Sequence, residues 1–336
     1  MVPYTVVPKP SADSRPSAMA EAISIALAHR SMALLVHAHG ETVLDAYWKE
    51  WNASTRRSIA SVSKSMVSVL VGICIHRGAI RSIDQPVADF VTEWRGTEKA
   101  VISIRHLLTM TSGLHNPPLW LLLLERSPAL TLGLELVQPP GSHWAYNTAA
   151  YCVLMTVIER ASGQLLEDFT QAALFGPLGM ERAQWHAWTV GRTHPLSVMC
   201  AGPDLMNFGR LLLQRGSWNG QLLLDPGYID RMLAPVTSLN KSYGHLIWLN
   251  RGEPQLAPGA PSDAAMAMGA SDSRLYVIPS RELVIVRLGG WVQAPRDRFP
   301  RKLQRSGSFD DLLLRAVCAA TTTAAAQQAA GPVTAA

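Results

Sequence analysis

The sequence has few cysteines, and none lies in a metal-binding arrangement. Cys74, Cys152, Cys200 and Cys318 are far apart among the 336 residues, and no C-x-x-C pair occurs. This spacing does not match the usual zinc-binding patterns or a disulfide framework. We therefore predict free thiols in a reducing compartment, and we expect neither a metal nor a cofactor.

Long apolar runs are also missing. No segment reaches the roughly 18 consecutive apolar residues that a membrane-spanning helix requires. The first 17 residues contain four prolines and several charges, whereas a signal peptide needs a continuous apolar stretch. These features predict a cytoplasmic protein without a membrane partner, unless a signal was already removed.

Charge is scarce as well, at 16% of residues with a formal net charge of +5. The cations are dispersed except for one cluster, whose only aromatic neighbour is Phe299. Nucleic-acid binding would need a structured basic surface interleaved with stacking aromatics, so we interpret this cluster as a solvated loop. Its members are Arg296, Arg298, Arg301, Lys302 and Arg305.

What is present is a hydrophobic content of 48%, enough for a large core. Strand-like runs occur near both ends of the chain and helical patterns lie between them, which predicts an α/β (α+β) fold with one antiparallel sheet. We expect an extended arm over 1–17, a single unit over 18–319 and a disordered tail over 320–336. Within the unit, 18–60 and 236–319 would form the α/β part, and 61–235 the mainly helical part.

The expected strands and helices follow from periodicity and breakers. The strands are predicted over 32–37, 42–48, 243–249, 274–278 and 282–288, and the helices over 18–29, 103–113, 119–124, 152–161, 204–215, 228–233 and 309–319.

The stretch 57–78 has the strongest candidate for chemistry. Ser61 lies where polar sequence gives way to an apolar run, which would place its hydroxyl in the first turn of a buried helix. Lys64 follows three residues later, on the same helix face and within reach for proton exchange. By itself the pattern leaves open an ordinary helix cap followed by a solvated lysine.

Three other features carry a functional and a structural interpretation each. His106 is either a general base or a core histidine of a short helix capped by Ser103. The apolar segment 119–124 is either a wall beside the site that favours acyl chains or a packed core helix. Tyr146 precedes a helix on a loop, a common position for catalytic side chains, but it could equally anchor that loop.

Several motifs, taken in order, resemble one family of serine hydrolases. They include Ser61-Val-Ser-Lys64, which has the S-x-x-K pattern, then His106-Leu-Leu-Thr-Met-Thr-Ser-Gly113, Tyr146 after Pro140-Gly141, and the region around Tyr243 and Trp248. This order is similar to that of the β-lactamase and penicillin-binding-protein fold, in the class C β-lactamase-related group that includes esterases and amide hydrolases.

The resemblance implies that Ser61 is the acylated nucleophile and that Lys64 and Tyr146 share proton transfer. It implies that the Ser61 N–H and a backbone N–H of Gly269, Ala270 or Ser271 bind the oxyanion. The partner would be a small ester or amide. β-Lactam or D-amino-acid peptide hydrolysis is an alternative, and so is a weakened sensor module that binds without turnover. The oligomeric state stays open.

Two departures from the family pattern bear on specificity. The family commonly has Tyr-Ser-Asn, but here Tyr146 is followed directly by Asn147, which puts the asparagine's contact to a substrate amide in question. The third motif commonly begins with a lysine or histidine, which the matching 268–272 lacks. Unless Arg274 substitutes for that cation, ester or simple amide hydrolysis is favoured over β-lactam hydrolysis.

Overall fold

The computed structural model describes residues 17–124, 127–186, 195–270, 272–289 and 307–329. Residues 1–16 of the expected arm, the basic cluster at 296–305 and Ser271 lie outside these ranges.

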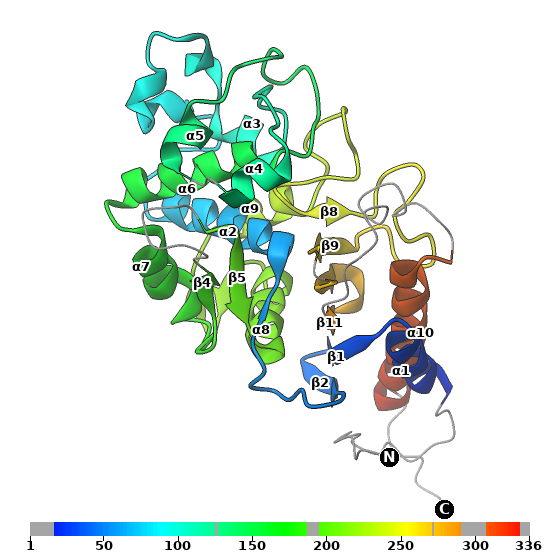
Figure 1. Cartoon of the computed structure of the whole chain (residues 1–336). Helices are drawn as coiled ribbons and strands as arrows, with labels where there is room; N and C mark the ends of the chain where they lie inside the picture. The colour runs from blue at the N-terminus through cyan, green and yellow to red at the C-terminus, as the bar shows by residue number, and fades with distance from the viewer. Residues whose placement is uncertain (1–16, 125–126, 187–194, 271, 290–306, 330–336) are drawn as a thin grey trace, which may run out of the picture.

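A six-stranded antiparallel sheet organises the molecule, and its strands come from both ends of the chain (Figure 1). The expected fold class, an antiparallel sheet flanked by helices, is confirmed. In spatial order the strands are β2 (Glu41–Tyr47), β1 (Ser31–Ala38), β11 (Leu283–Gly289), β10 (Arg274–Ile278), β9 (Ala265–Met268) and β8 (Trp248–Leu249).

The predicted hairpin at the start of the sheet is β1 and β2. Both turn residues, His39 and Gly40, have positive φ, the backbone that matches the right-handed twist of a two-residue hairpin. Every residue of β1 is buried, because helices cover both faces of the sheet. Such a strand reads as a continuous apolar run, as 32–36 does.

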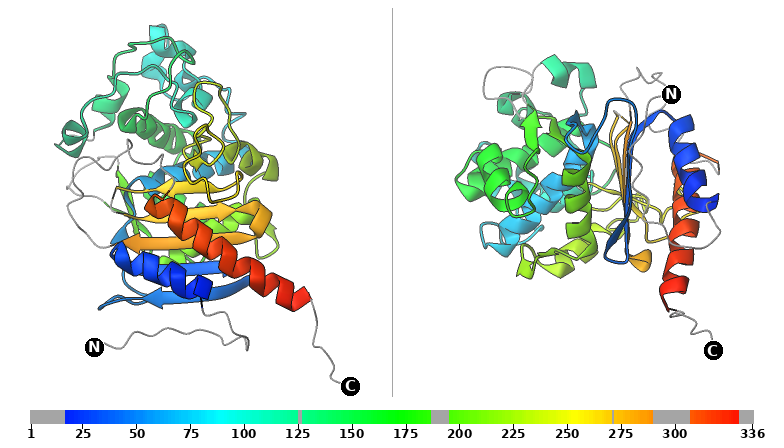
Figure 2. Two further views of the ribbon diagram at one scale, coloured as in Figure 1. Left: turned by 90° about the vertical axis from the view of Figure 1, so that its right-hand side faces the viewer. Right: turned by 90° about the horizontal axis from the view of Figure 1, so that it is seen from below.

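Helices α1 (Ser17–Ala28) and α10 (Phe309–Ala329) cover the outer face of the sheet (Figure 2). The expectation that the chain becomes disordered after residue 319 is wrong for the part described, since α10 continues to Ala329. Alanine has the highest helix propensity of all residues, so this Ala-rich segment extends the helix. Residues 330–336 lie outside the described ranges.

The inner face of the sheet packs against α8 (Gly202–Leu213) and the helical region beyond it (Figure 2). Gly209 allows α8 to approach closely, since a Cβ there would overlap the side chains of Leu275 and Val284. Behind α8 lies α2 (Ser63–His76), in which every residue from Ser63 to Cys74 is buried.

The remaining elements form the helical region and two small sheets. The helices are α3 (Ile104–Leu108), α4 (Leu119–Leu124), α5 (Pro128–Leu132), α6 (Thr148–Ser162), α7 (Leu166–Thr170), α9 (Pro226–Met232) and the short turns η1 (Ala60–Val62), η2 (Val87–Asp89), η3 (Thr92–Trp94), η4 (Glu98–Val101), η5 (Gln171–Phe175) and η6 (Pro279–Arg281). The short strands are β3 (Arg57–Ser58), β4 (Gln184–His186), β5 (Ser197–Cys200), β6 (Ser217–Trp218) and β7 (Gln221–Leu222).

One predicted strand is mostly wrong. Of 243–249, only β8 pairs in the sheet, and Tyr243 reaches it through an isolated bridge to Trp248. The Gly244 N–H donates instead to the Ile247 carbonyl, and the His245 N–H donates to the Met232 carbonyl of α9. The segment therefore folds back as a tight turn against α9.

Candidate active site

Ser61 lies on the single turn η1 that leads into α2, as its position at the polar-to-apolar boundary predicted. Val62 and all of the following residues to Cys74 are buried, while Ser61 itself is half-buried. Its hydroxyl is thus held at the head of a rigid, buried helix but stays accessible from one side.

The backbone just before Ser61 is strained and firmly held. Ala60 has a φ of 48°, a left-handed conformation that is costly for a residue with a Cβ and that often occurs at functional sites. The Ala60 N–H donates to Ser197 Oγ at 2.9 Å, and Ser197 Oγ in turn contacts Ser58 Oγ at 2.7 Å. These contacts compensate for the strain and fix the direction in which Ser61 points.

Lys64 approaches the Ser61 hydroxyl. Its side chain is only 3% exposed, and Nζ donates to Ser61 Oγ at 3.3 Å. The three-residue spacing puts the two groups on one helix face, so the geometry permits proton exchange between them.

Tyr146 lies on the loop before α6 and faces the same lysine. The centre of its ring is 5.0 Å from Lys64 Nζ. Trp248 of β8 stacks on the Tyr146 ring, with ring centres 5.9 Å apart and an interplanar angle of 15°, and Tyr243 packs edge-on with its ring centre at 6.3 Å. The Tyr146 carbonyl accepts a 3.0 Å hydrogen bond from Asn116 Nδ2. The structure therefore brings Ser61, Lys64 and Tyr146 together and holds the tyrosine rigidly.

The side chain of Asn147 is fully engaged in hydrogen bonds to the backbone. Its Oδ1 accepts from the Ala150 N–H and caps α6, and its Nδ2 donates to the carbonyls of Leu114 and His115 at 3.0 Å each. The residue is buried. A contact from this side chain to a substrate would have to replace one of these hydrogen bonds.

Gly269 passes directly over the turn η1 that carries Ser61. A Cβ at this position would overlap the carbonyl oxygen of Ile59 and crowd Ala60, so only glycine fits. The Gly269 N–H donates to the Ser273 carbonyl and is therefore engaged within the strand end. Of the other predicted oxyanion donors, Ala270 is exposed next to it, and Ser271 lies outside the described residues.

Arg274 begins strand β10 and is held by the outer layer. Its Nε donates to Asp310 Oδ1 of α10 at 3.0 Å, and its Nη1 donates to the Gly269 carbonyl at 3.0 Å. Tyr276 also donates to the same Asp310 oxygen. For Arg274 to bind a substrate carboxylate, as the sequence suggested, it would have to leave this buried ion pair.

His106 belongs to the cap of α3. The Ser103 N–H donates to its Nδ1 at 3.1 Å, so the imidazole completes the helix start. Burial, together with the charge of Arg105, lowers the pKa of His106. These contacts support the structural interpretation of this residue.

Sequence reasoning missed two side chains that contact the site. Tyr151 of α6 places its ring centre 4.6 Å from Lys64 Nζ, and Ser197 of β5 accepts from the Ala60 N–H in the turn η1. Tyr151 follows Tyr146 by five residues, so a helix started by Asn147 could have indicated it. Ser197 is 136 positions after Ser61, and no local signal connects them.

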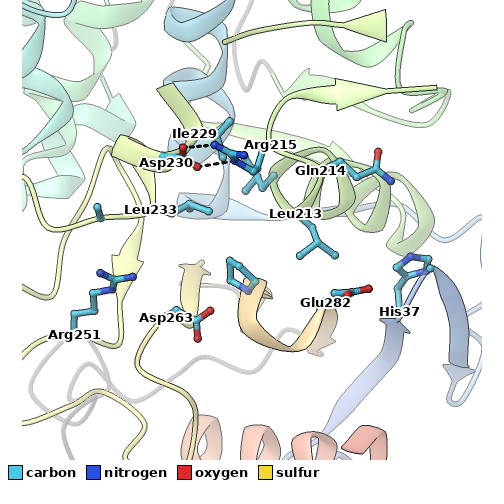
Figure 3. A pocket seen from close by; sticks show the side chains of 14 residues that line it. His37, Leu213, Gln214, Arg215, Ile229, Asp230, Leu233, Arg251, Asp263 and Glu282 are labelled. Atoms are coloured by element: carbon cyan, nitrogen blue, oxygen red, sulfur yellow. Dashed lines mark hydrogen bonds and ion pairs between the residues drawn. The ribbon is translucent and has the colours of Figure 1, made fainter. Parts of the chain in front are cut away.

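A cavity of about 640 Å³ opens at the end of the central strands that lies away from Ser61 (Figure 3). It is lined by the ends of α8 and α9 and by the residues that turn from β10 into β11, including Glu282. Ser61 lies instead beside Gly269, near the start of β10. In the described ranges, no group of three acidic, histidine or cysteine side chains could hold a metal, and no helix is long and apolar enough to cross a membrane.

Comparison with known proteins agrees with this geometry. The model of the Beta-lactamase family matches residues 19–211. Esterase EstB of Burkholderia gladioli is 34% identical over 148 residues, which cover 36% of this chain and 36% of the esterase. A D-aminopeptidase of Brucella canis is 26% identical over 171 residues, which cover 45% of this chain and 32% of that enzyme. The matches thus span about a third of each relative's length.

A solved structure extends the likeness to the whole fold. EstCE1, titled a hydrolase with promiscuous acyltransferase activity, superposes with a TM-score of 0.71 at 16% identity, covering 90% of this chain and 98% of that one. At this identity the superposition shows the fold alone, whereas the family match over 19–211 includes Ser61, Lys64 and Tyr146. The chain belongs to the Beta-lactamase family.

Proposed function

We propose that this protein is a serine acyl hydrolase that cleaves small carboxylic esters or simple amides through an acyl-Ser61 intermediate. The observation that supports it best is the contact from Lys64 Nζ to Ser61 Oγ at 3.3 Å, with Tyr146 packed against the same ammonium.

In the proposed reaction, Ser61 Oγ attacks the substrate carbonyl carbon and passes its proton to Lys64 Nζ, which enters this step as the free amine and becomes the ammonium. Tyr146 shares the transfer of that proton to the leaving group. The tetrahedral intermediate collapses as the carbon–oxygen or carbon–nitrogen bond breaks, and the leaving group takes up that proton. A water molecule then attacks the acyl-Ser61 ester, which releases the carboxylic acid and returns the proton to Ser61. Backbone N–H groups at Ser61 and near Ala270 would stabilise the oxyanion.

Two engaged side chains favour neutral substrates over β-lactams. Arg274 is paired with Asp310, and Asn147 caps α6. Neither is free to bind the carboxylate or the amide of a penicillin. With Arg274 held in this ion pair, uncharged esters should be accepted more readily than substrates that carry a carboxylate.

The test is active-site labelling followed by a substrate screen. A fluorophosphonate probe should label the native protein at Ser61, and Ser61→Ala should abolish the labelling. Ser63→Ala is the matched control, because that neighbouring hydroxyl is buried and accepts from the Val198 N–H. Labelling at another residue, or none, would disprove the proposal.

The screen separates the alternatives. Hydrolysis of p-nitrophenyl butyrate should exceed that of a chromogenic cephalosporin and of D-amino-acid amides. The reverse order would support the β-lactamase or D-aminopeptidase alternative, for which a D-aminopeptidase relative is the supporting observation. Acylation of Ser61 without turnover would instead indicate a sensor.

A further inference from the structure

Lys64 is a buried cation that lacks a carboxylate partner. Its side chain is 3% exposed, and within the described part of the chain it forms no ion pair with an acidic residue. Its one hydrogen bond there goes to the neutral Ser61 hydroxyl. A buried ammonium without compensation is costly, so other groups must stabilise it.

Two aromatic rings lie near the Lys64 ammonium, where a carboxylate partner would otherwise be expected. Lys64 Nζ lies 5.0 Å from the ring centre of Tyr146 and 4.6 Å from that of Tyr151. Both distances are within the range of about 6 Å for a cation–π contact, which is strongest where water is excluded. The ammonium therefore sits between two ring faces and points at the Ser61 hydroxyl.

The local fold explains why Tyr151 reaches this position. Asn147 caps α6, and the Tyr151 N–H bonds to the Asn147 carbonyl in the first turn. Tyr146 lies just before the cap and Tyr151 just after the first turn. One rigid helix start thus presents both rings to the lysine.

The hydroxyl group does not account for a tyrosine at this position. Tyr151 is fully buried, and its Oη has no hydrogen-bond partner among the described residues. Burial raises the pKa of Tyr151, so the phenol stays neutral. What the residue offers Lys64 is the face of its ring.

We infer that Tyr151 is a positioning residue, whose ring face holds the Lys64 ammonium in place against Ser61. Tyr151 itself touches neither the substrate nor the Ser61 hydroxyl. The labelling readout below rests on the proposed function, whereas the stability readout does not.

The test reduces the negative charge on the ring face of residue 151 while keeping the shape of the ring. Tyr151→Phe should label with a fluorophosphonate within about twofold of the wild-type rate, because the ring face is kept. Phenylalanines with an increasing number of ring fluorines at this position weaken the negative face step by step. The labelling rate should fall progressively, by about tenfold for the fully fluorinated ring, as expected for the loss of a desolvated cation–π contact.

The matched control is the same series at Tyr228. That ring is also fully buried and packs on α2 beside Gly72, but it faces no lysine in the described structure. Its fluorinated variants should label at an unchanged rate. A flat series at Tyr151, or an equal fall at Tyr228, would overturn the inference.

A stability readout decides the matter even if Ser61 is not labelled. In urea unfolding, fluorination at Tyr151 should lower the midpoint progressively in the wild-type background and have no such trend in Lys64→Met. Equal trends in both backgrounds would show that the ring only packs. Failure of labelling in the wild type would refute the proposed function alone.

Discussion

Protonation of His245 should make the fold acid-sensitive. This residue is 0% exposed, and neither of its ring nitrogens has a hydrogen-bond partner among the described residues. Burial, with the charges of Arg105 and Arg231, lowers the pKa of His245 to about 3 from an ordinary value of 6.5. The folded protein therefore binds no proton here between pH 6.5 and 3, whereas the unfolded chain does.

The sign and size of the effect follow from linkage. Where the unfolded state binds more protons, the free energy of unfolding falls as the pH falls, by about 1.4 kcal/mol per pH unit for one group. Stability from the neutral His245 is thus complete above pH 6.5 and is lost progressively toward pH 3. Between pH 8 and pH 5 the loss is about 2 kcal/mol.

The perturbation is His245→Leu, which roughly conserves the volume and removes both nitrogens. Urea unfolding of the variant and the wild type at pH 8 and pH 5 gives the difference in unfolding free energy at each pH. Contributions from other titrating groups, such as His37 and His106, cancel in this difference. The lost ring contact with Tyr228, at 5.6 Å, is independent of pH.

We expect the difference to shift by about 2 kcal/mol in favour of the variant at pH 5. A difference that does not change with pH would mean that His245 is protonated in the folded state or bonded to a group that keeps its pKa ordinary. The reasoning from its burial would then be refuted.

The remaining predictions concern the supports of the site. Asn147→Ala should destabilise the protein by about 2 to 4 kcal/mol in urea unfolding, because it removes a helix cap and takes the donor from the buried Leu114 carbonyl and the partly buried His115 carbonyl; Asn147→Ser, which keeps the cap, should lose less, and equal losses would contradict this account. Gly269→Ala should cut fluorophosphonate labelling at least tenfold, because its Cβ overlaps the Ile59 carbonyl, and labelling at the wild-type rate would contradict that. Leu119 and Trp120 are 56% and 61% exposed and follow the segment that binds Tyr146. Burying about two of the four extra methylenes of a hexanoate ester there, at about 0.8 kcal/mol each, should raise its kcat/KM roughly tenfold above that of an acetate ester. Trp120→Ser should shrink this advantage, and a flat chain-length profile would exclude the contact.

The apolar segment 119–124 shows what an apolar sequence pattern alone could not predict, namely which of its side chains are buried. The sequence left a packed core helix and an apolar wall beside the site as alternatives, and the structure shows that the segment is the helix α4. Leu122 is buried while Leu119 and Trp120 are largely exposed. The apolar run left both interpretations open, because which side of the helix meets solvent depends on neighbours that are distant in the chain.

Local sequence determined the positions of Ser61 and Lys64, the proposed nucleophile and its lysine. The spacing of Ser61 and Lys64 sets one helix face, and the apolar run after them makes the helix buried. The antiparallel sheet was predicted from strand-like runs near both ends of the chain, and the end of α6 from Gly163. The start of α6 was predicted at residue 152, whereas Asn147 caps the helix at Thr148.

Only the tertiary structure decided which groups are free to act. The sequence left Arg274 as a possible substrate-binding cation, but in the structure it pairs with Asp310 of α10. Asn147 was a possible substrate contact, but its amide donates to the carbonyls of Leu114 and His115. Tyr151 and Ser197 reach the site through helix packing and strand pairing. Hydrogen bonds and ring contacts between residues far apart in the chain leave no local sequence pattern. The sequence therefore determined which candidate side chains the site contains, and packing determined which residues contact them and hold them in place.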